Sequence, residues 1–186
     1  MNELLVPHYF LAIPVPEQIA NELAYWYESL KALHPFEKWN HPLDLHVTLV
    51  FLGSSTQEQL EQIRNHLPGG VGRTSRFSLE LSHLDTFGLE ERPRIFWAGL
   101  KEEPQLYELQ SDTKSLMEGI GFSLDNRPYR PHITLGKKWM GPFPFQLPQF
   151  PLRGLSWTVD QVVLYSIELD SVPRNKPIQS FRLHST

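Results

Sequence analysis

One short pattern occurs twice in the chain and constrains its fold more than any other feature. The two copies, His46-Val47-Thr48-Leu49 and His132-Ile133-Thr134-Leu135, begin 86 residues apart. From the numbers of His and Thr in the chain, about 0.3 His-x-Thr matches are expected by chance. Both copies lie in β-prone apolar runs, where alternate side chains share a face, so the His and Thr of each copy point away from the apolar residues. The duplication therefore predicts two similar strands that each present a His-Thr pair.

The residues around the two motifs show strand and helix patterns in alternation. Runs rich in apolar and β-branched residues predict strands at 8–13, 45–51, 77–81, 94–100, 131–137, 161–169 and 178–183. Helical spacing and capping residues predict helices that begin near residues 16, 57 and 104. The apolar stripe of the first helix extends to Leu33, Pro68-Gly69-Gly70 ends the second helix, and Gly121 ends the third.

Strand–helix–strand units thus recur on either side of the middle of the chain. We expect an α+β fold in which residues 1–186 form a single domain of two similar lobes, with antiparallel sheets flanked by helices around a central cleft. If a pseudo-twofold axis relates the lobes, the two His-Thr pairs meet across that cleft.

Composition excludes several classes of protein. The chain has no Cys, which rules out disulfides, thiolate nucleophiles and thiolate metal sites and fits a cytoplasmic location. Its formal net charge of −4 argues against a protein that coats long nucleic acids, although a terminal phosphate could still bind to local basic residues. No apolar run reaches the roughly 18 residues of a membrane span, and the N-terminus lacks the pattern of a secretory leader.

Two facing imidazoles suit phosphodiester hydrolysis without a metal ion. Histidine has an ordinary pKa near 6.5, so one copy can act as a base while the other acts as an acid. A threonine hydroxyl beside each histidine can donate a hydrogen bond to a non-bridging phosphate oxygen. His46 and His132 are therefore the predicted catalytic residues.

Four stretches carry a resemblance to a known family, and they extend over nearly the whole chain. They are YFLAIP at 9–14, HVTLVFLG at 46–53, PRIFWAGL at 93–100 and RPHITLGK at 130–137. Through them the sequence resembles the two-histidine (2H) phosphoesterases and, within these, the bacterial RNA 2′,3′-cyclic phosphodiesterases, long called 2′-5′ RNA ligases. The resemblance implies a bilobal fold, no metal or other cofactor, and opening of a 2′,3′-cyclic phosphate to a 2′-phosphate. It also implies that His46 protonates the departing O3′ and that His132 activates water.

Five further residues are candidates for substrate binding. Thr48 and Thr134 are the expected phosphate donors, and Arg130 and Lys137 flank the second motif as phosphate or nucleotide contacts. Family members often carry Arg where this chain has Lys137, which keeps the charge but loses the bidentate fork. Phe51 has two interpretations: strand alternation favours a core position, whereas a bulge would turn its ring towards a base. We favour the core position.

Other functions remain open from the sequence. The same fold could bind nucleotides or RNA without turnover, or join RNA ends through a 2′-5′ linkage. A zinc site formed by His34, His41 and His46 has spacings that fit no common ligand pattern, so we expect no metal. The expected partners are RNA 3′ ends or small cyclic nucleotides, with no membrane association and a monomeric state.

Overall fold

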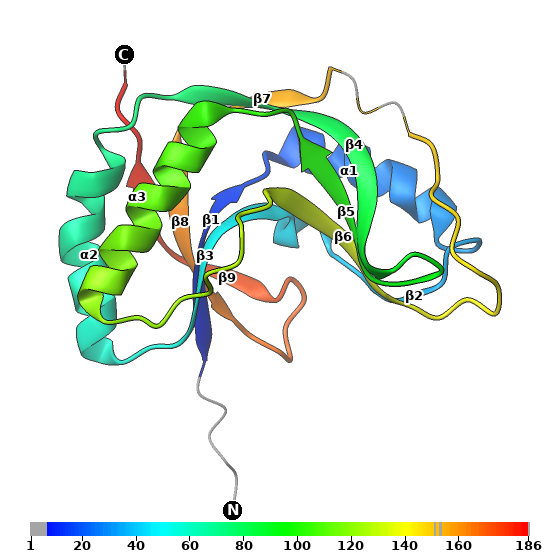
Figure 1. The fold of residues 1–186 in the computed structure, drawn as a ribbon, viewed down its shortest axis with the longest axis horizontal. Coiled ribbons are helices and arrows are strands. Elements are labelled where there is room, and N and C mark those ends of the chain that lie inside the picture. Colours follow the sequence, from blue (N-terminus) through cyan, green and yellow to red (C-terminus); the bar gives the residue numbers. More distant parts are fainter. Residues whose placement is uncertain (1–6, 151, 153, 186) are drawn as a thin grey trace, which may run out of the picture.

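The computed structural model describes residues 7–150, 152 and 154–185 (Figure 1). Within these residues, three α-helices and one short 3-10 helix accompany two antiparallel sheets. The elements in chain order are β1 (His8–Pro14), α1 (Glu17–Leu30), β2 (Phe36–Trp39), η1 (Pro42–Asp44), β3 (His46–Ser54), α2 (Gln57–Val71), β4 (Phe77–Leu89), β5 (Arg92–Leu100), α3 (Pro104–Ile120), β6 (His132–Trp139), β7 (Ser156–Val159), β8 (Gln161–Ile167) and β9 (Asn175–Arg182).

The two sheets repeat one strand order. The first sheet has the order β3-β1-β8-β9, and the second has the order β2-β6-β5-β4-β7. Without the additional edge strand β2, the second order reproduces the first, so that β6 corresponds to β3 and β5 corresponds to β1. The expected α+β fold with two pseudo-twofold-related lobes is confirmed.

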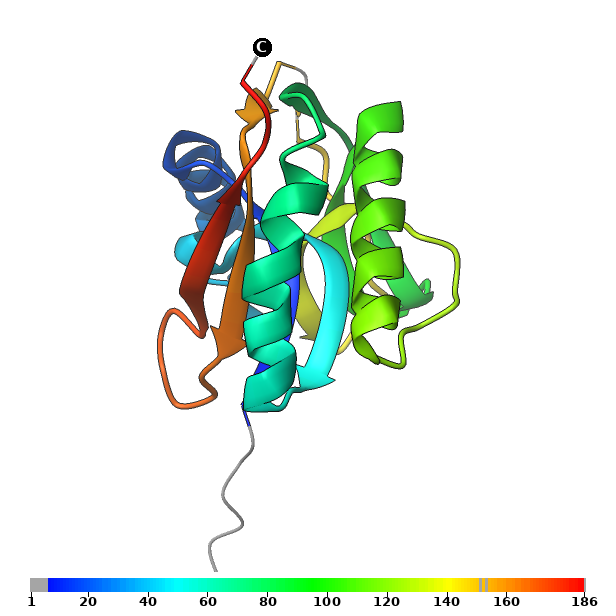
Figure 2. The ribbon, with the colours of Figure 1, turned by 90° about the vertical axis from the view of Figure 1, so that its left-hand side faces the viewer.

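Two of the helices, α1 and α3, connect the lobes because each covers the sheet opposite to the one it follows. α2 and α3 lie side by side over the first sheet, where α3 contacts β3 and α2 contacts β9 (Figure 2). α1 lies on the other side of the molecule, and its Trp26 ring packs against Phe96 of β5 in the second sheet. α1 follows β1 and α3 follows β5, so each of these two helices leaves one sheet and covers the other, whereas α2 follows β3 and covers the sheet that contains β3. One continuous set of buried apolar side chains therefore extends through both lobes.

Two helix ends differ from the sequence-based expectation. α1 ends at Leu30, and Leu33 lies beyond it with 76% of its surface exposed, so its assignment to the apolar stripe was wrong. α2 begins with the expected Thr56 capping box but continues past Pro68 to Val71. Val71 is almost fully buried, and its burial stabilises a final turn in which only the N–H of Pro68 is missing.

Strand lengths also differ. β4 continues to Leu89, which pairs with Arg92 of β5 across a turn at Glu90 and Glu91, and Gly88, with φ of 105°, lies at a shift of register in this ladder. The expectation for 77–81 was therefore too short. The two four-residue strands β2 and β7 were not predicted, because four residues are too few to show a clear period.

No helix among the described residues is long and apolar enough to cross a membrane. Residues 1–6, on which most of the expectation about an N-terminal leader depends, lie outside the described part of the chain.

Candidate active site

The two motifs open equivalent strands and expose the same positions. β3 begins at His46, and both His46 and Thr48 are half-buried, whereas Val47 and Leu49 are buried. β6 begins at His132 and repeats this burial pattern over its first six residues. The predicted alternation is confirmed in both strands.

Both motif strands then contain a bulge at the same place. In β3 the register shifts between Thr48 and Val50, and in β6 it shifts between Thr134 and Gly136. Leu49 and Leu135 are the extra residues, since neither has a partner in its ladder. Each bulge moves the side chains that follow it to the opposite face of the sheet from the one that simple alternation predicts.

The bulges decide the positions of Phe51 and Lys137, each five residues after a motif histidine. With the extra residue counted, both lie on the same face of their sheet as the His-Thr pairs. Phe51 is 54% exposed and meets the ring of His8 edge-on, at 5.9 Å between ring centres. The core interpretation of Phe51 was wrong because simple alternation does not survive a bulge.

The ring of His46 is fixed by one hydrogen bond and two aromatic neighbours. Its Nδ1 lies 2.7 Å from the backbone carbonyl oxygen of Asp44, and since a carbonyl only accepts, Nδ1 carries the proton. The imidazole centre lies 4.7 Å from the ring of Phe10 and 6.2 Å from that of Tyr165. In the neutral ring, Nε2 is left with a free lone pair.

His132 repeats this arrangement with different neighbours. Its Nδ1 donates to the backbone carbonyl of Arg130 at 2.7 Å. Phe87 meets the ring edge-on at 5.0 Å, and Trp97 lies 5.6 Å away. Each histidine therefore donates to the carbonyl two residues before it and presents Nε2 for chemistry.

Burial makes both imidazoles weaker bases than usual. It lowers the pKa of His46 to about 4, against the opposing effect of the Asp44 carbonyl, while the charges of Lys137 and His132 lower this pKa further. Burial also lowers the pKa of His132, opposed by the Arg130 carbonyl. Without substrate, both rings are neutral at neutral pH. A bound phosphate would favour the charged form of each and raise both pKa values.

Two side-chain hydrogen bonds join the segment before each motif strand to the other motif strand. The Tyr129 hydroxyl, from the segment before β6, donates to the backbone carbonyl of Thr48 at 3.0 Å. The Asn40 amide, from the segment before β3, donates to the carbonyl of Thr134 at 2.8 Å. Burial raises the pKa of Tyr129, which keeps its hydroxyl protonated as a donor. The segment before each motif thus holds the other motif in place.

The predicted substrate-binding side chains have different surroundings. Among the hydrogen bonds of the described residues, none involves the hydroxyl of Thr48 or Thr134. The Arg130 side chain is exposed, and only its carbonyl contacts a motif histidine. Lys137 is close enough to His46 to affect its pKa.

Two site neighbours were missed by the sequence reasoning. Asp44 is buried, and its carboxylate accepts the backbone N–H groups of Arg174 at 3.0 Å and Asn175 at 2.8 Å. His83 shares a cross-strand row with Gly99 and His132, and a Cβ on Gly99 would lie 2.3 Å from the His83 ring. The proximity of Asp44 to His46 in the sequence was a signal for the first; the glycine opposite His83 becomes informative only after the register is known.

The described residues contain no cluster of three or more His, Asp or Glu side chains placed to hold a metal ion. The ring of His34 contacts the carbonyl of Gln146, whereas the ring of His41 accepts the backbone N–H of Leu43. The three histidines of the conceivable zinc site therefore have separate partners.

Comparisons with known proteins identify the family of the chain. Residues 15–171 match the family model described as the 2'-5' RNA ligase superfamily. A protein of Bacillus subtilis named RNA 2',3'-cyclic phosphodiesterase is 35% identical over 95% of this chain and 97% of its own length. A protein of Geobacillus stearothermophilus with the same name is 36% identical over 95% of this chain, which spans 57% of that protein. The crystal structure of Escherichia coli LigT complexed with 3'-AMP has a TM-score of 0.78 and 26% identity, and the match covers 95% of this chain and 98% of that one.

Proposed function

Because this chain belongs to the 2'-5' RNA ligase superfamily, we propose that it hydrolyses the 2′,3′-cyclic phosphate at RNA 3′ ends to a 2′-phosphate without a metal ion. Two relatives named RNA 2',3'-cyclic phosphodiesterase support the reaction, and the LigT complex with 3'-AMP supports binding of a nucleotide or RNA end. The observation that carries the mechanism is the matched pair of Nδ1–carbonyl hydrogen bonds, since these leave Nε2 of both rings for proton transfer.

The proposed reaction moves one proton at each imidazole. His132 removes a proton from water through Nε2 as the water oxygen attacks phosphorus. The P–O3′ bond breaks, and His46 gives the proton on its Nε2 to O3′, which leaves the phosphate on O2′. The Thr48 and Thr134 hydroxyls and the Lys137 ammonium donate to the non-bridging oxygens, where negative charge accumulates in the transition state.

The low pKa of His46 fits this cycle only with substrate present. At a pKa of about 4 the free ring is neutral at pH 7 and has no proton to give. The cyclic phosphodiester carries a negative charge, and its arrival favours the protonated ring. Substrate binding thus prepares the acid that the reaction requires.

The remaining parts of the proposal concern the substrate and its setting. The exposed ring of Phe51 stacks on a base, and Arg130 attracts the RNA backbone. One chain supplies both histidines, so the proposed unit is a monomer in which residues 1–186 act as one domain. We place it in the cytoplasm, a reducing compartment that fits a chain without Cys.

The test is a product-resolved assay with an oligonucleotide that ends in a 2′,3′-cyclic phosphate, performed after EDTA treatment. We expect a 2′-phosphate product at an unchanged rate, and a loss of about 10²–10⁴-fold in kcat for His46→Ala and for His132→Ala. Strict dependence on added metal would contradict the mechanism. Binding without turnover would support the binding-module alternative, and a joined 2′-5′ product would support ligation.

A further inference from the structure

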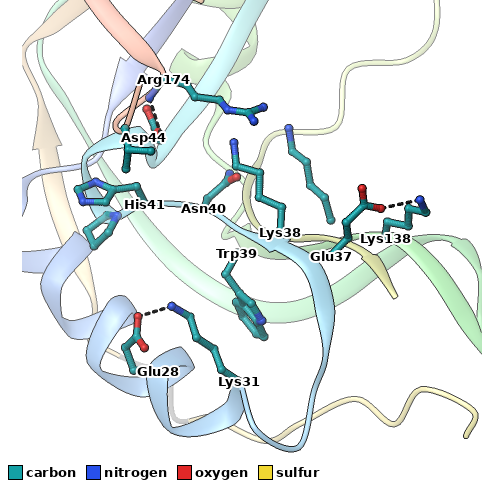
Figure 3. Close-up of a pocket in the computed structure, with 13 residues that line it drawn as sticks. Glu28, Lys31, Glu37, Lys38, Trp39, Asn40, His41, Asp44, Lys138 and Arg174 are labelled. Carbon is teal, nitrogen blue, oxygen red and sulfur yellow. Dashed lines mark hydrogen bonds and ion pairs between the residues drawn. The ribbon is translucent and has the colours of Figure 1, made fainter. Parts of the chain in front are cut away.

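A basic hollow lies beside the paired histidines and includes neither imidazole. Its volume is about 570 Å³, and Lys38 of β2, Lys137 of β6 and Arg174 of the turn between β8 and β9 contribute cations to its wall. In Figure 3, the charged ends of Lys38 and Arg174 point into the same part of the hollow. Three segments distant in the sequence thus bring positive charge together next to the candidate active site.

These three cations repel one another. Lys38 lies directly opposite Lys137 in the β2–β6 pair, an arrangement that costs stability for like charges. Desolvation lowers the pKa of both lysines, and the charge of Arg174 lowers both further. The Asp44 carboxylate acts in the opposite direction with the smallest effect on each. The fold therefore maintains a concentration of charge that its own acidic residues do not neutralise.

Other cations of the same hollow do have acidic partners. Lys31 pairs with Glu28, and Lys138 pairs with Glu37 at 2.6 Å. Among the ion pairs of the described residues, none involves Lys38, Lys137 or Arg174. The hollow thus contains two neutralised lysines, which serve as internal controls, and three cations available to an external anion.

Asp44 connects this hollow to the chemistry. Its carboxylate accepts the backbone N–H groups of Arg174 and Asn175, which fixes the turn that carries the Arg174 side chain. Its backbone carbonyl accepts the Nδ1–H of His46. One buried residue therefore positions both an acid–base histidine and a cation of the hollow. An anion bound there would be held at a fixed place relative to the cyclic phosphate.

We propose that Lys38 and Arg174 bind a second phosphate of the substrate, namely the phosphate on the 5′ side of the terminal nucleotide. This inference rests on the proposed function, because it assumes that the cyclic phosphate lies between the two histidines. A nucleotide has one phosphate position besides its cyclic end, and that is the 5′ position. The enzyme consequently selects RNA ends and 5′-phosphorylated nucleotides over cyclic nucleotides with a free 5′-hydroxyl.

The test compares a nucleoside 2′,3′-cyclic phosphate with the same compound carrying a 5′-phosphate. We expect the wild type to prefer the second substrate by about tenfold or more in kcat/KM, mostly through KM, since hydrogen bonds to charged groups have about this effect. Lys38→Gln and Arg174→Gln should each move this ratio towards one. Lys31→Gln and Lys138→Gln remove charge from the same hollow but leave the three unpaired cations, so they should keep the ratio.

Two further measurements keep the outcomes distinct. The preference should decrease with ionic strength, and Lys38→Gln should not lower the Tm, because it removes a repulsive pair. A wild-type ratio near one, or equal losses in the control variants, would overturn the inference. Absence of hydrolysis with both substrates would contradict only the proposed function. The ratio of the two Kd values from calorimetry on the same variants would then test the hollow.

Discussion

His46 and His132 begin equivalent strands, yet the position five residues after each holds Phe51 in one lobe and Lys137 in the other. The motif, the bulge, the Nδ1–carbonyl hydrogen bond and the aromatic neighbours are repeated. The side chain that each bulge brings to the site face differs between the two lobes. In the proposed reaction the repeated parts serve proton transfer, which uses one imidazole as the base and the other as the acid. The unrepeated parts give the site a direction, with an aromatic ring at one end and positive charge at the other.

Among the changes that test the comparison of the two histidines, we expect pH to have the largest effect on kcat/KM. Because burial lowers both histidine pKa values, the bell of kcat/KM for the free enzyme should have its maximum on the acid side of 6.5, the usual histidine value. Above the higher of the two pKa values, kcat/KM should fall about tenfold per pH unit, as the last imidazole proton is lost.

The bound phosphate raises both pKa values, so the bell of kcat should lie at higher pH than that of kcat/KM. The measurement is a pair of pH profiles, whose limbs belong to the coupled pair rather than to one residue. A rate that rises steadily with pH would contradict acid catalysis.

The next effect compares the two positions delivered by the bulges. Lys137→Ala should lower kcat/KM by about tenfold through loss of a charged donor, whereas Lys137→Arg should keep or raise it. Phe51→Ala should act mainly on KM, by a factor of about 5–100, the usual range for loss of base stacking. Steady-state kinetics with a cyclic-phosphate-ended oligonucleotide separates these outcomes. A silent Lys137→Ala variant would make that residue ordinary surface.

The smallest expected effect is on stability. Tyr129→Phe removes the hydrogen bond to the Thr48 carbonyl and should cost about 0.5–1.5 kcal/mol in the free energy of unfolding. Denaturant unfolding measures this change, and Tyr107→Phe, at an exposed tyrosine whose ring meets that of Tyr129, is the matched control. Equal stability of the two variants would show that the link between the motifs contributes nothing.

The local features of the fold were predictable from the sequence. Strand alternation identified β3 and β6, the capping box identified the start of α2, and Gly121, with φ of 102°, ends α3 as expected. Each of these signals is contained within a few neighbouring residues. They were sufficient because helix ends and strand faces depend on local backbone chemistry.

The surroundings of the motifs were not predictable in the same way. A bulge leaves no sequence mark at Leu49, so the face of Phe51 could not be read from alternation. The contact between Asp44 and Arg174 joins residues 130 positions apart, and Lys38 lies in a strand of four residues. The hollow therefore becomes visible only when three segments are placed in space.

In the proposed mechanism the two similar histidines have opposite roles, with His46 as the acid and His132 as the base. The decisive measurement is turnover of a 2′-phosphodiester substrate whose leaving group needs no protonation. We expect this substrate to restore turnover of His46→Ala far more than turnover of His132→Ala, because only the acid becomes dispensable. Equal restoration, or restoration of His132→Ala alone, would contradict the assignment.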